Sequence, residues 1–209
     1  MTPATLTPHA FAKAASPEQV ERTARALAAH ALTVEVLENA QAARARVAAL
    51  VPEGAAVYTA ASETLRLSGI EADLNHSGRH VAVKPRARSL DRATQSAQIR
   101  RLTATPDVVV GSVSAVTEDG TLVASASGSQ LPAYAGGAGQ VILVVGAQKI
   151  VPDLAAALRR IETYALPLED ARARATYGRP SAINKLLVVN AEPFPGRTTV
   201  LLLREAIGF

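Results

Sequence analysis

Small hydroxyl residues and a glycine follow a predicted strand at positions 125–130, a composition that suits anion binding. The candidate ligand-binding residues of this loop are Ser125, Ser127, Gly128, Ser129 and Gln130. Backbone N–H groups in such a loop can approach a phosphate or carboxylate closely, and Ser129 can cap a following helix. The loop is not a P-loop, because the required Gly-Lys-Ser/Thr ending is absent. Two interpretations remain open, an ordinary Ser/Gly loop and a cradle for an anion.

Lys149 is a candidate catalytic residue because it follows the apolar run at 140–145 and precedes a predicted helix start at Pro152. We expect its ammonium group to reach the crevice at the end of the sheet, where it can bind an anion. A desolvated lysine can also act as a general base or as a Schiff-base nucleophile. An exposed loop lysine is the alternative interpretation.

Two carboxylates stand at the tip of a predicted hairpin, in the run Glu118-Asp119-Gly120. Asp-Gly between two apolar runs is a strong signal for a hairpin with a type I′ turn. On the structural interpretation these residues only make the turn. On the functional interpretation Glu118 or Asp119 is a catalytic nucleophile or general base beside the Ser/Gly loop, with Gly120 among the ligand-binding residues.

Two more segments provide candidate ligand-binding residues. Gly111 and Ser114 lie at the end of the apolar run 107–113, and Asn184 and Lys185 lead into another apolar run. Ligands of open parallel sheets bind at the carboxyl ends of the strands, so we expect these residues in one pocket with Lys149. Helix capping and loop hydrogen bonds explain Asn184 and Lys185 nearly as well.

Several kinds of site are excluded by what the sequence lacks. There is no cysteine, which excludes thiol catalysis, Cys-held zinc and an Fe–S cluster bound by this chain. His76 and His80 have a spacing that suits a metal, but Asn75 and Gly78 favour a loop there. The motifs His-Glu-x-x-His, Gly-x-Ser-x-Gly and Gly-x-Gly-x-x-Gly do not occur. We therefore predict no metal site and no bound cofactor.

Positioning these residues requires a sheet that brings strand ends together. Apolar runs alternate with helical patterns, which is typical of βαβ units in a mainly parallel sheet with helices on both sides. The predicted strands are 32–37, 55–59, 81–83, 107–113, 140–145, 186–189 and 198–203, and the predicted helices are 16–30, 42–50, 63–67, 89–103 and 152–161. The 113–126 hairpin and the last two strands are expected to add antiparallel pieces. We expect residues 1–15 to form a loose arm and residues 16–209 a single α/β domain.

The charge is unevenly distributed along the chain. The net charge is +4, yet the segment 79–101 has seven basic residues against the single acid Asp91, a local charge of +6. This segment is a solvated face, an anionic partner site or a nucleic-acid site, and the last is least favoured because no recognition motif accompanies it. No secretory signal is present, and no apolar run approaches the ~20 residues that a membrane span needs. We predict a cytoplasmic protein that does not enter a membrane.

The motifs, taken in order, resemble the LUD (lactate-utilisation) domain family. The match begins with the apolar strand, small-residue step and acid-x-Gly-Thr hairpin of 107–123. It continues through the Ser/Gly loop, the run 141–152 and the ending 180–185, and it covers about residues 34–209. The resemblance implies a three-layer α/β/α fold with a mainly parallel sheet, similar to that of ribose-phosphate isomerases, glucosamine-phosphate isomerases and CoA transferases.

The resemblance also implies kinship with LutC/YkgG-type proteins, which take part in oxidising L-lactate to pyruvate beside Fe–S oxidoreductase partners. We therefore expect an accessory component of lactate utilisation that binds a small anionic metabolite: an organic acid, a phosphate or a CoA ester. The alternative is a stand-alone isomerase or CoA-transferase type of enzyme, in which Glu118 stands loosely where CoA transferases have their nucleophile. Whether the protein is an enzyme is left open.

Overall fold

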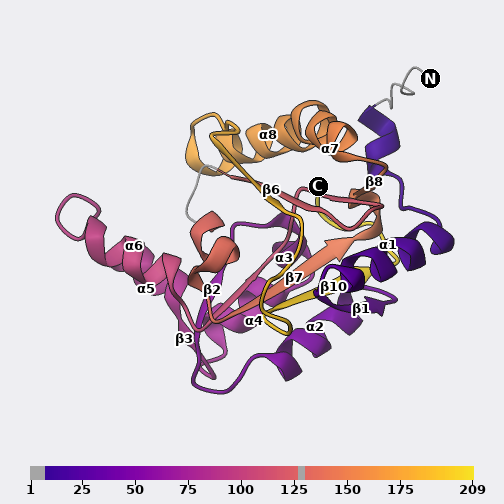
Figure 1. The fold of residues 1–209 in the computed structure, drawn as a ribbon. Coiled ribbons are helices and arrows are strands. Elements are labelled where there is room, and N and C mark those ends of the chain that lie inside the picture. Colours follow the sequence, from indigo (N-terminus) through magenta and orange to yellow (C-terminus); the bar gives the residue numbers. More distant parts are fainter. Residues whose placement is uncertain (1–7, 127–129) are drawn as a thin grey trace.

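The computed structural model describes residues 8–126 and 130–209 (Figure 1). Within these residues six strands form a parallel sheet in the order β1-β10-β7-β4-β2-β3. They are β1 (Thr33–Leu37), β2 (Ala56–Thr59), β3 (Val81–Ala82), β4 (Val108–Gly111), β7 (Gln140–Gly146) and β10 (Thr198–Leu203). A second, four-stranded sheet has the order β8-β5-β6-β9. Its strands are β5 (Ala115–Thr117), β6 (Leu122–Ala126), β8 (Ile150–Val151) and β9 (Lys185–Val189).

Helices cover both faces of the parallel sheet. One face is covered by α2 (Ala40–Leu50), α3 (Glu63–Leu67) and α4 (Ile70–His76). The other is covered by α1 (Pro17–Ala29), α5 (Val83–Ser89) and the second sheet. On the outer side of the second sheet lie α7 (Leu154–Arg160) and a π-helical turn, η4 (Ile161–Ala165), which continues into α8 (Leu166–Tyr177). The three-layer α/β/α fold with a mainly parallel sheet is therefore confirmed, with the small sheet added on one side.

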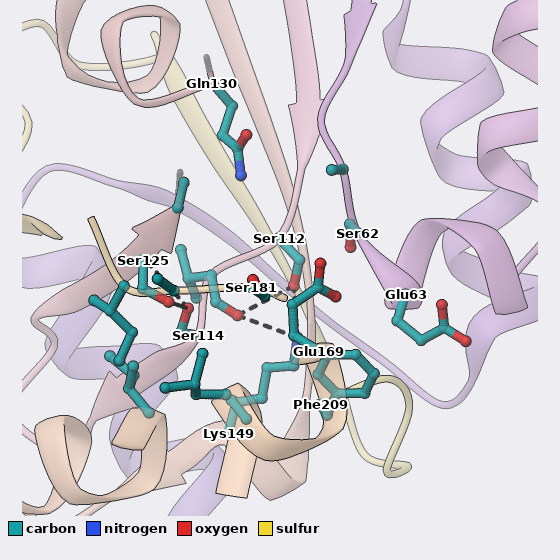
Figure 2. Close-up of a pocket in the computed structure, with 18 residues that line it drawn as sticks. Ser62, Glu63, Ser112, Ser114, Ser125, Gln130, Lys149, Glu169, Ser181 and Phe209 are labelled. Atoms are coloured by element: carbon teal, nitrogen blue, oxygen red, sulfur yellow. Dashed lines mark hydrogen bonds between the residues drawn. The ribbon is translucent and has the colours of Figure 1, made fainter. Parts of the chain in front are cut away.

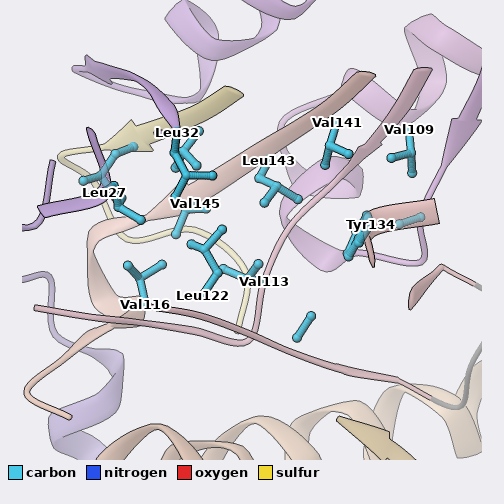
Figure 3. Packing of buried hydrophobic residues seen from close by; sticks show 14 of the residues in the cluster. Leu27, Leu32, Val109, Val113, Val116, Leu122, Tyr134, Val141, Leu143 and Val145 are labelled. Atoms are coloured by element: carbon cyan, nitrogen blue, oxygen red, sulfur yellow. The ribbon is translucent and has the colours of Figure 1, made fainter. Parts of the chain in front are cut away.

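The strands of the parallel sheet are apolar on both faces because both are covered. Every residue of β4 and of β10 is buried. Figure 3 shows how Val116 and Leu122 of the second sheet face Leu143 and Val145 of β7. This packing fixes the second sheet against the carboxyl-terminal half of the parallel one, where the pocket described below is formed.

The start of the described chain is more ordered than the sequence suggested. Ser16 caps α1 in a reciprocal capping box with Gln19, as its sequence pattern predicts. Residues 8–12 form a 3₁₀ turn, η1 (Pro8–Ala12), and Phe11 is only 3% exposed. The Phe11 ring contacts Tyr164 of η4. Phe11 thus packs on the domain, residues 1–7 lie outside the described part, and the loose arm over residues 1–15 stays a prediction.

The predicted antiparallel pairing of the last two strands is wrong. β10 lies between β1 and β7 and is parallel to both, whereas β9 pairs antiparallel with β6 in the other sheet. The physical reason is burial: a strand that is apolar on both faces belongs in the covered parallel sheet. Leu186 and Val188 of β9 are instead partly exposed, at 47% and 39%.

The expected helix over 89–103 is also wrong at its start. The chain forms α5 up to Ser89 and begins α6 (Ser96–Ala104) only after a turn. Asp91 makes this turn, because its carboxylate accepts hydrogen bonds from the Ala93 N–H and the Thr94 hydroxyl. Local side-chain bonds of this kind compete with the helix. α4 and α8 were not predicted, and α4 includes Asn75 and His76, which we expected in a loop.

The hairpin β5–β6 is present, but its turn is not type I′. A type I′ turn needs positive φ at both central residues, and Asp119 does not have it. The turn is closed by the Gly120 N–H donating to the Thr117 carbonyl, with Gly120 at φ 90°. A Cβ on Gly120 would lie 2.7 Å from the carbonyl carbon of Ala26, so glycine lets this turn pack on the end of α1.

Within the described ranges 8–126 and 130–209, no helix has the length and apolar character to cross a membrane.

Candidate functional site

A small pocket lies where the strand-end rule places a site. It is built by the residues that follow β2, β4 and β7, together with the end of β6, η4, α8 and the segment before β9 (Figure 2). Its volume is about 130 Å³. The polar residues that line it are Ser62, Glu63, Ser112, Ser114, Ser125, Gln130, Lys149, Glu169 and Ser181. Five serine hydroxyl groups and one amine therefore dominate a cavity with room for a small molecule.

Lys149 is the most unusual of these residues. It belongs to the 3₁₀ turn η3 (Ala147–Lys149) directly after β7, and it is 2% exposed. Its Nζ lies 3.0 Å from the Thr64 Oγ1, 3.0 Å from the Ser112 Oγ and 3.1 Å from the Val113 carbonyl oxygen. Burial, and then the positive charge of Arg160, hold the pKa of Lys149 well below its usual value.

Arg160 is a buried cation behind the pocket. Its side chain is fully buried, and it donates hydrogen bonds to the carbonyls of Gln148 and Ser114. Its guanidinium also lies 5.1 Å from the centre of the Tyr164 ring. Burial lowers the pKa of Arg160 to about 10. Neither Arg160 nor Lys149 has a carboxylate partner in the part of the chain that the structure describes.

The carboxylates that line the pocket are held by arginines outside it. Glu63 forms a two-fold hydrogen bond with Arg66 on α3, which holds the pKa of Glu63 below its usual value. Glu169 forms the same kind of pair with Arg172 on α8. Since both acids are already paired, the uncompensated charge at the pocket is positive.

The end of β4 is shaped around a buried tyrosine. The Tyr134 hydroxyl donates to the Ser112 carbonyl at 3.3 Å, and burial raises the pKa of this phenol. A Cβ on Gly111 would overlap that hydroxyl and would come within 2.7 Å of the Tyr134 Cζ. Glycine at 111 therefore allows the tyrosine to reach the backbone that carries Ser112 into the pocket.

Four of the predicted site residues meet in this pocket: Ser114, Ser125, Gln130 and Lys149. The hydroxyls of Ser114 and Ser125 are hydrogen-bonded to each other at 2.8 Å, and the Ser125 N–H donates to the Ser114 Oγ. Gly111 lies just behind the pocket, in β4. Ser127, Gly128 and Ser129 lie outside the described residues. The catalytic and binding roles of all these residues stay predictions.

Other predicted residues do not line the pocket. The Glu118 carboxylate binds Gln19 and Arg22 of α1, and its hydrogen bonds to them hold its pKa below the usual value against the opposing effect of burial. Asp119 receives a hydrogen bond from Thr117 within the hairpin turn, and Gly120 packs on α1.

At the start of β9, Asn184 and Lys185 are exposed, and it is the preceding residues Ser181, Ala182 and Ile183 that line the pocket.

Sequence reasoning missed several contributors, among them Ser112, Arg160 and Glu169. Ser112 lies between the predicted residues Gly111 and Ser114 but was not singled out, because the sequence does not show which hydroxyl of that step faces inward. Arg160 is typical of a solvated last helical turn, and nothing in the sequence marks it as buried. Glu169 comes from α8, which was not predicted.

A wider groove adjoins the pocket. Its volume is about 710 Å³, and it shares the residues 61–63 with the small pocket. Basic side chains from three helices, α3, α5 and α8, line it, namely Arg66, Lys84, Arg88 and Arg172. The other basic residues of the segment 79–101 are exposed, whereas Lys84 is buried and paired with Glu71.

The covered parallel sheet with a polar pocket at its strand ends defines an α/β protein with a candidate ligand site. A crystal structure of a DUF162 family protein from Deinococcus radiodurans has this fold, with a TM-score of 0.54 and 16% identity. The similarity covers 95% of this chain and 99% of that one. The LUD domain profile matches residues 20–203, and the chain therefore belongs to the LUD domain family. No curated protein matches it.

Proposed function

We propose that this protein is a cytoplasmic component of L-lactate utilisation that binds a small organic acid in the Lys149 pocket and acts beside Fe–S oxidoreductase partners. Membership of the LUD domain family supports the lactate-related role. The observation that carries ligand binding is the buried amine of Lys149, with the buried guanidinium of Arg160 behind it, beside a small hydroxyl-lined cavity. A carboxylate in this cavity would supply the negative charge that the surrounding protein does not.

The size of the pocket supports a small acid. Its volume of about 130 Å³ is the space of roughly four waters at ~30 Å³ each. Drug-sized ligands occupy sites of ~300–1,000 Å³, well above this volume. A three-carbon hydroxy or keto acid is of the right size, and the hydroxyls of Ser112, Ser114 and Ser125 offer partners for its oxygen atoms.

Binding can be tested by thermal unfolding in the presence of L-lactate or pyruvate, with lactamide as the uncharged control. A ligand at 100 times its Kd stabilises the folded state by about 2.7 kcal/mol. For a chain of this length that raises Tm by roughly 5–11 °C. Lys149→Met should abolish the shift, and the control Lys13→Met, at an exposed position outside the pocket, should keep it. Equal shifts with the acid and the amide, or a shift retained by Lys149→Met, would contradict the proposed site.

The role in lactate utilisation needs a separate experiment in the source organism. Deleting the gene should slow growth on L-lactate and leave growth on glucose unchanged. The wild-type gene should restore growth, whereas the Lys149→Met gene should not. Normal growth of the deletion strain on L-lactate would argue against this role, whatever the binding assay shows.

A second candidate function is that of a stand-alone enzyme of isomerase or CoA-transferase type, acting on a phosphorylated or CoA-linked metabolite. The observation that favours it is the basic groove beside the pocket, with Arg66, Arg88 and Arg172 along its walls. Arginine suits phosphate groups because its planar fork makes two parallel hydrogen bonds. The same thermal assay with sugar phosphates and short acyl-CoAs distinguishes the two candidate functions. Stabilisation by these compounds, and not by L-lactate or pyruvate, would support the stand-alone enzyme.

A further inference from the structure

We propose that Ser112 is a nucleophile activated by Lys149, and that the pocket transfers or hydrolyses a short acyl group carried as an ester or thioester. This activity is independent of the proposed role in lactate utilisation. It rests on the geometry of one hydroxyl and one amine, 3.0 Å apart, at the edge of a cavity sized for a small acyl group. Figure 2 shows the Lys149 side chain extending to Ser112 at the pocket wall.

The hydrogen bonds around Lys149 fit a neutral amine. A neutral Nζ has two N–H donors and one lone pair. The Val113 carbonyl can only accept, so it takes one N–H. The Thr64 hydroxyl takes the other, because it donates its own proton to the Ile207 carbonyl at 3.2 Å. The lone pair is then left for the Ser112 hydroxyl.

The Ser112 hydroxyl has little competition for its proton. Apart from Lys149, the acceptor that the described residues offer it is the Val113 carbonyl, at 3.4 Å. Distances near 2.7–2.8 Å are typical of good O–H···O bonds, so this one is weak. Lys149 is thus the better acceptor, and a serine beside an unprotonated lysine is an established nucleophile–base arrangement.

The surroundings favour the neutral form of the lysine. Burial and the neighbouring charge of Arg160 both lower the pKa of Lys149, and in the described residues no carboxylate forms an ion pair with it. The Tyr134 hydroxyl, bonded to the Ser112 carbonyl, fixes the backbone of the nucleophile. Gln130 lines the same pocket and provides a side-chain N–H donor for the oxygen of the substrate carbonyl.

The reaction can be written in balanced steps. As the Ser112 Oγ bonds to the acyl carbon, its proton moves to the Lys149 Nζ, and the carbonyl π electrons move onto the carbonyl oxygen. When the carbonyl re-forms, the bond to the leaving alkoxide or thiolate breaks, and that group takes the proton from Nζ. Water then attacks the acyl-serine by the same proton route, releasing the carboxylic acid and restoring the Ser112 hydroxyl.

The chain offers a matched control for the nucleophile. Ser114 and Ser125 line the same pocket, but their hydroxyls bond to each other rather than to an amine. A reagent that merely enters the pocket would meet these serines as well. Selective reaction at Ser112 therefore reports activation by Lys149 rather than exposure alone.

The test uses diisopropyl fluorophosphate, in which a nucleophilic serine displaces fluoride, with intact mass and peptide mapping as the readout. We expect one adduct per chain at Ser112, none there in Ser112→Ala, and an unchanged adduct in Ser114→Ala. Lys149→Met should slow labelling by ~100-fold or more, the contribution typical of a general base. Lys13→Met, at an exposed position outside the pocket, should label at the wild-type rate.

An unlabelled wild-type protein, an adduct at another residue, or a wild-type labelling rate in Lys149→Met would overturn the proposal. Circular dichroism melts show which variants fold. If Ser112→Ala does not fold, the peptide map of the wild-type adduct decides the question by itself. Because labelling needs neither lactate nor a partner protein, its outcome is separate from the tests of the proposed function.

Discussion

Replacing Lys149 by methionine should remove a dependence of stability on pH that the buried amine imposes. The folded-state pKa of Lys149 is lowered by burial and by Arg160, whereas in the unfolded chain it is near 10.4. Between these two values the unfolded chain binds more protons than the folded one, so the free energy of unfolding rises with pH. Methionine fills similar space and carries no proton.

The magnitude follows from the linkage relation. One proton bound only in the unfolded state gives a slope of about 1.4 kcal/mol per pH unit. This slope applies at pH values below the Lys149 pKa of the unfolded chain and above the Lys149 pKa of the folded protein. Between pH 7 and 9, below the Arg160 pKa of about 10, the wild-type protein should thus gain up to about 2.7 kcal/mol over the variant.

Urea unfolding followed by circular dichroism at several pH values measures this difference, with the m-value checked for constancy. Lys185→Met, at an exposed position on β9, is the control and should keep the wild-type slope. A wild-type-minus-Lys149→Met difference that stays flat from pH 7 to 9 would refute the reasoning. The amine would then be charged in the folded protein, and it could not serve as a base.

Three further predictions concern the scaffold, each measured by urea unfolding. Gly111→Ala should cost about 1–3 kcal/mol through overlap with the Tyr134 hydroxyl, and Tyr134→Phe in the same chain should recover part of that loss. Gly120→Ala should cost about 1–3 kcal/mol, since alanine at positive φ is strained and would clash with α1. Arg197→Met should lower the free energy of unfolding by about 3–5 kcal/mol, because the buried Glu192 carboxylate loses its ion-pair partner. Protonating Glu192 with acid should reduce this difference in stability between the variant and the wild type.

Most strands could be predicted from the sequence because strands that are buried on both faces consist of continuous apolar residues. The runs around Val57, Val109 and Val144 are apolar without alternation, and all three are central strands of the covered sheet. The pairing of β9 was not recoverable in this way. Its residues alternate only weakly, and its partner, β6, is specified by tertiary packing rather than by any local signal.

Part of the site was predictable from the rule that ligands bind at the carboxyl ends of parallel strands. That rule brought Lys149, Ser114 and Ser125 together from three separate segments. It failed for Glu118, because the hairpin turns that carboxylate toward Arg22 on α1, a direction that depends on how the second sheet packs. It could not select Ser112, whose inward orientation follows from the fit of Tyr134 against Gly111.

The position of β10 has a consequence for how the chain folds during synthesis. Thr33 of β1 pairs with Thr199 of β10, so β1 has no neighbour in its sheet until that distant segment has been made. At ~5–20 residues per second the ribosome needs on the order of ten seconds to reach it. The edge of β1 stays open to pairing with other chains throughout that interval, and the edge of β7 that β10 later covers is open once β7 has been made. Folding is therefore dominated by non-local contacts, and nascent chains of this protein depend on protection from aggregation.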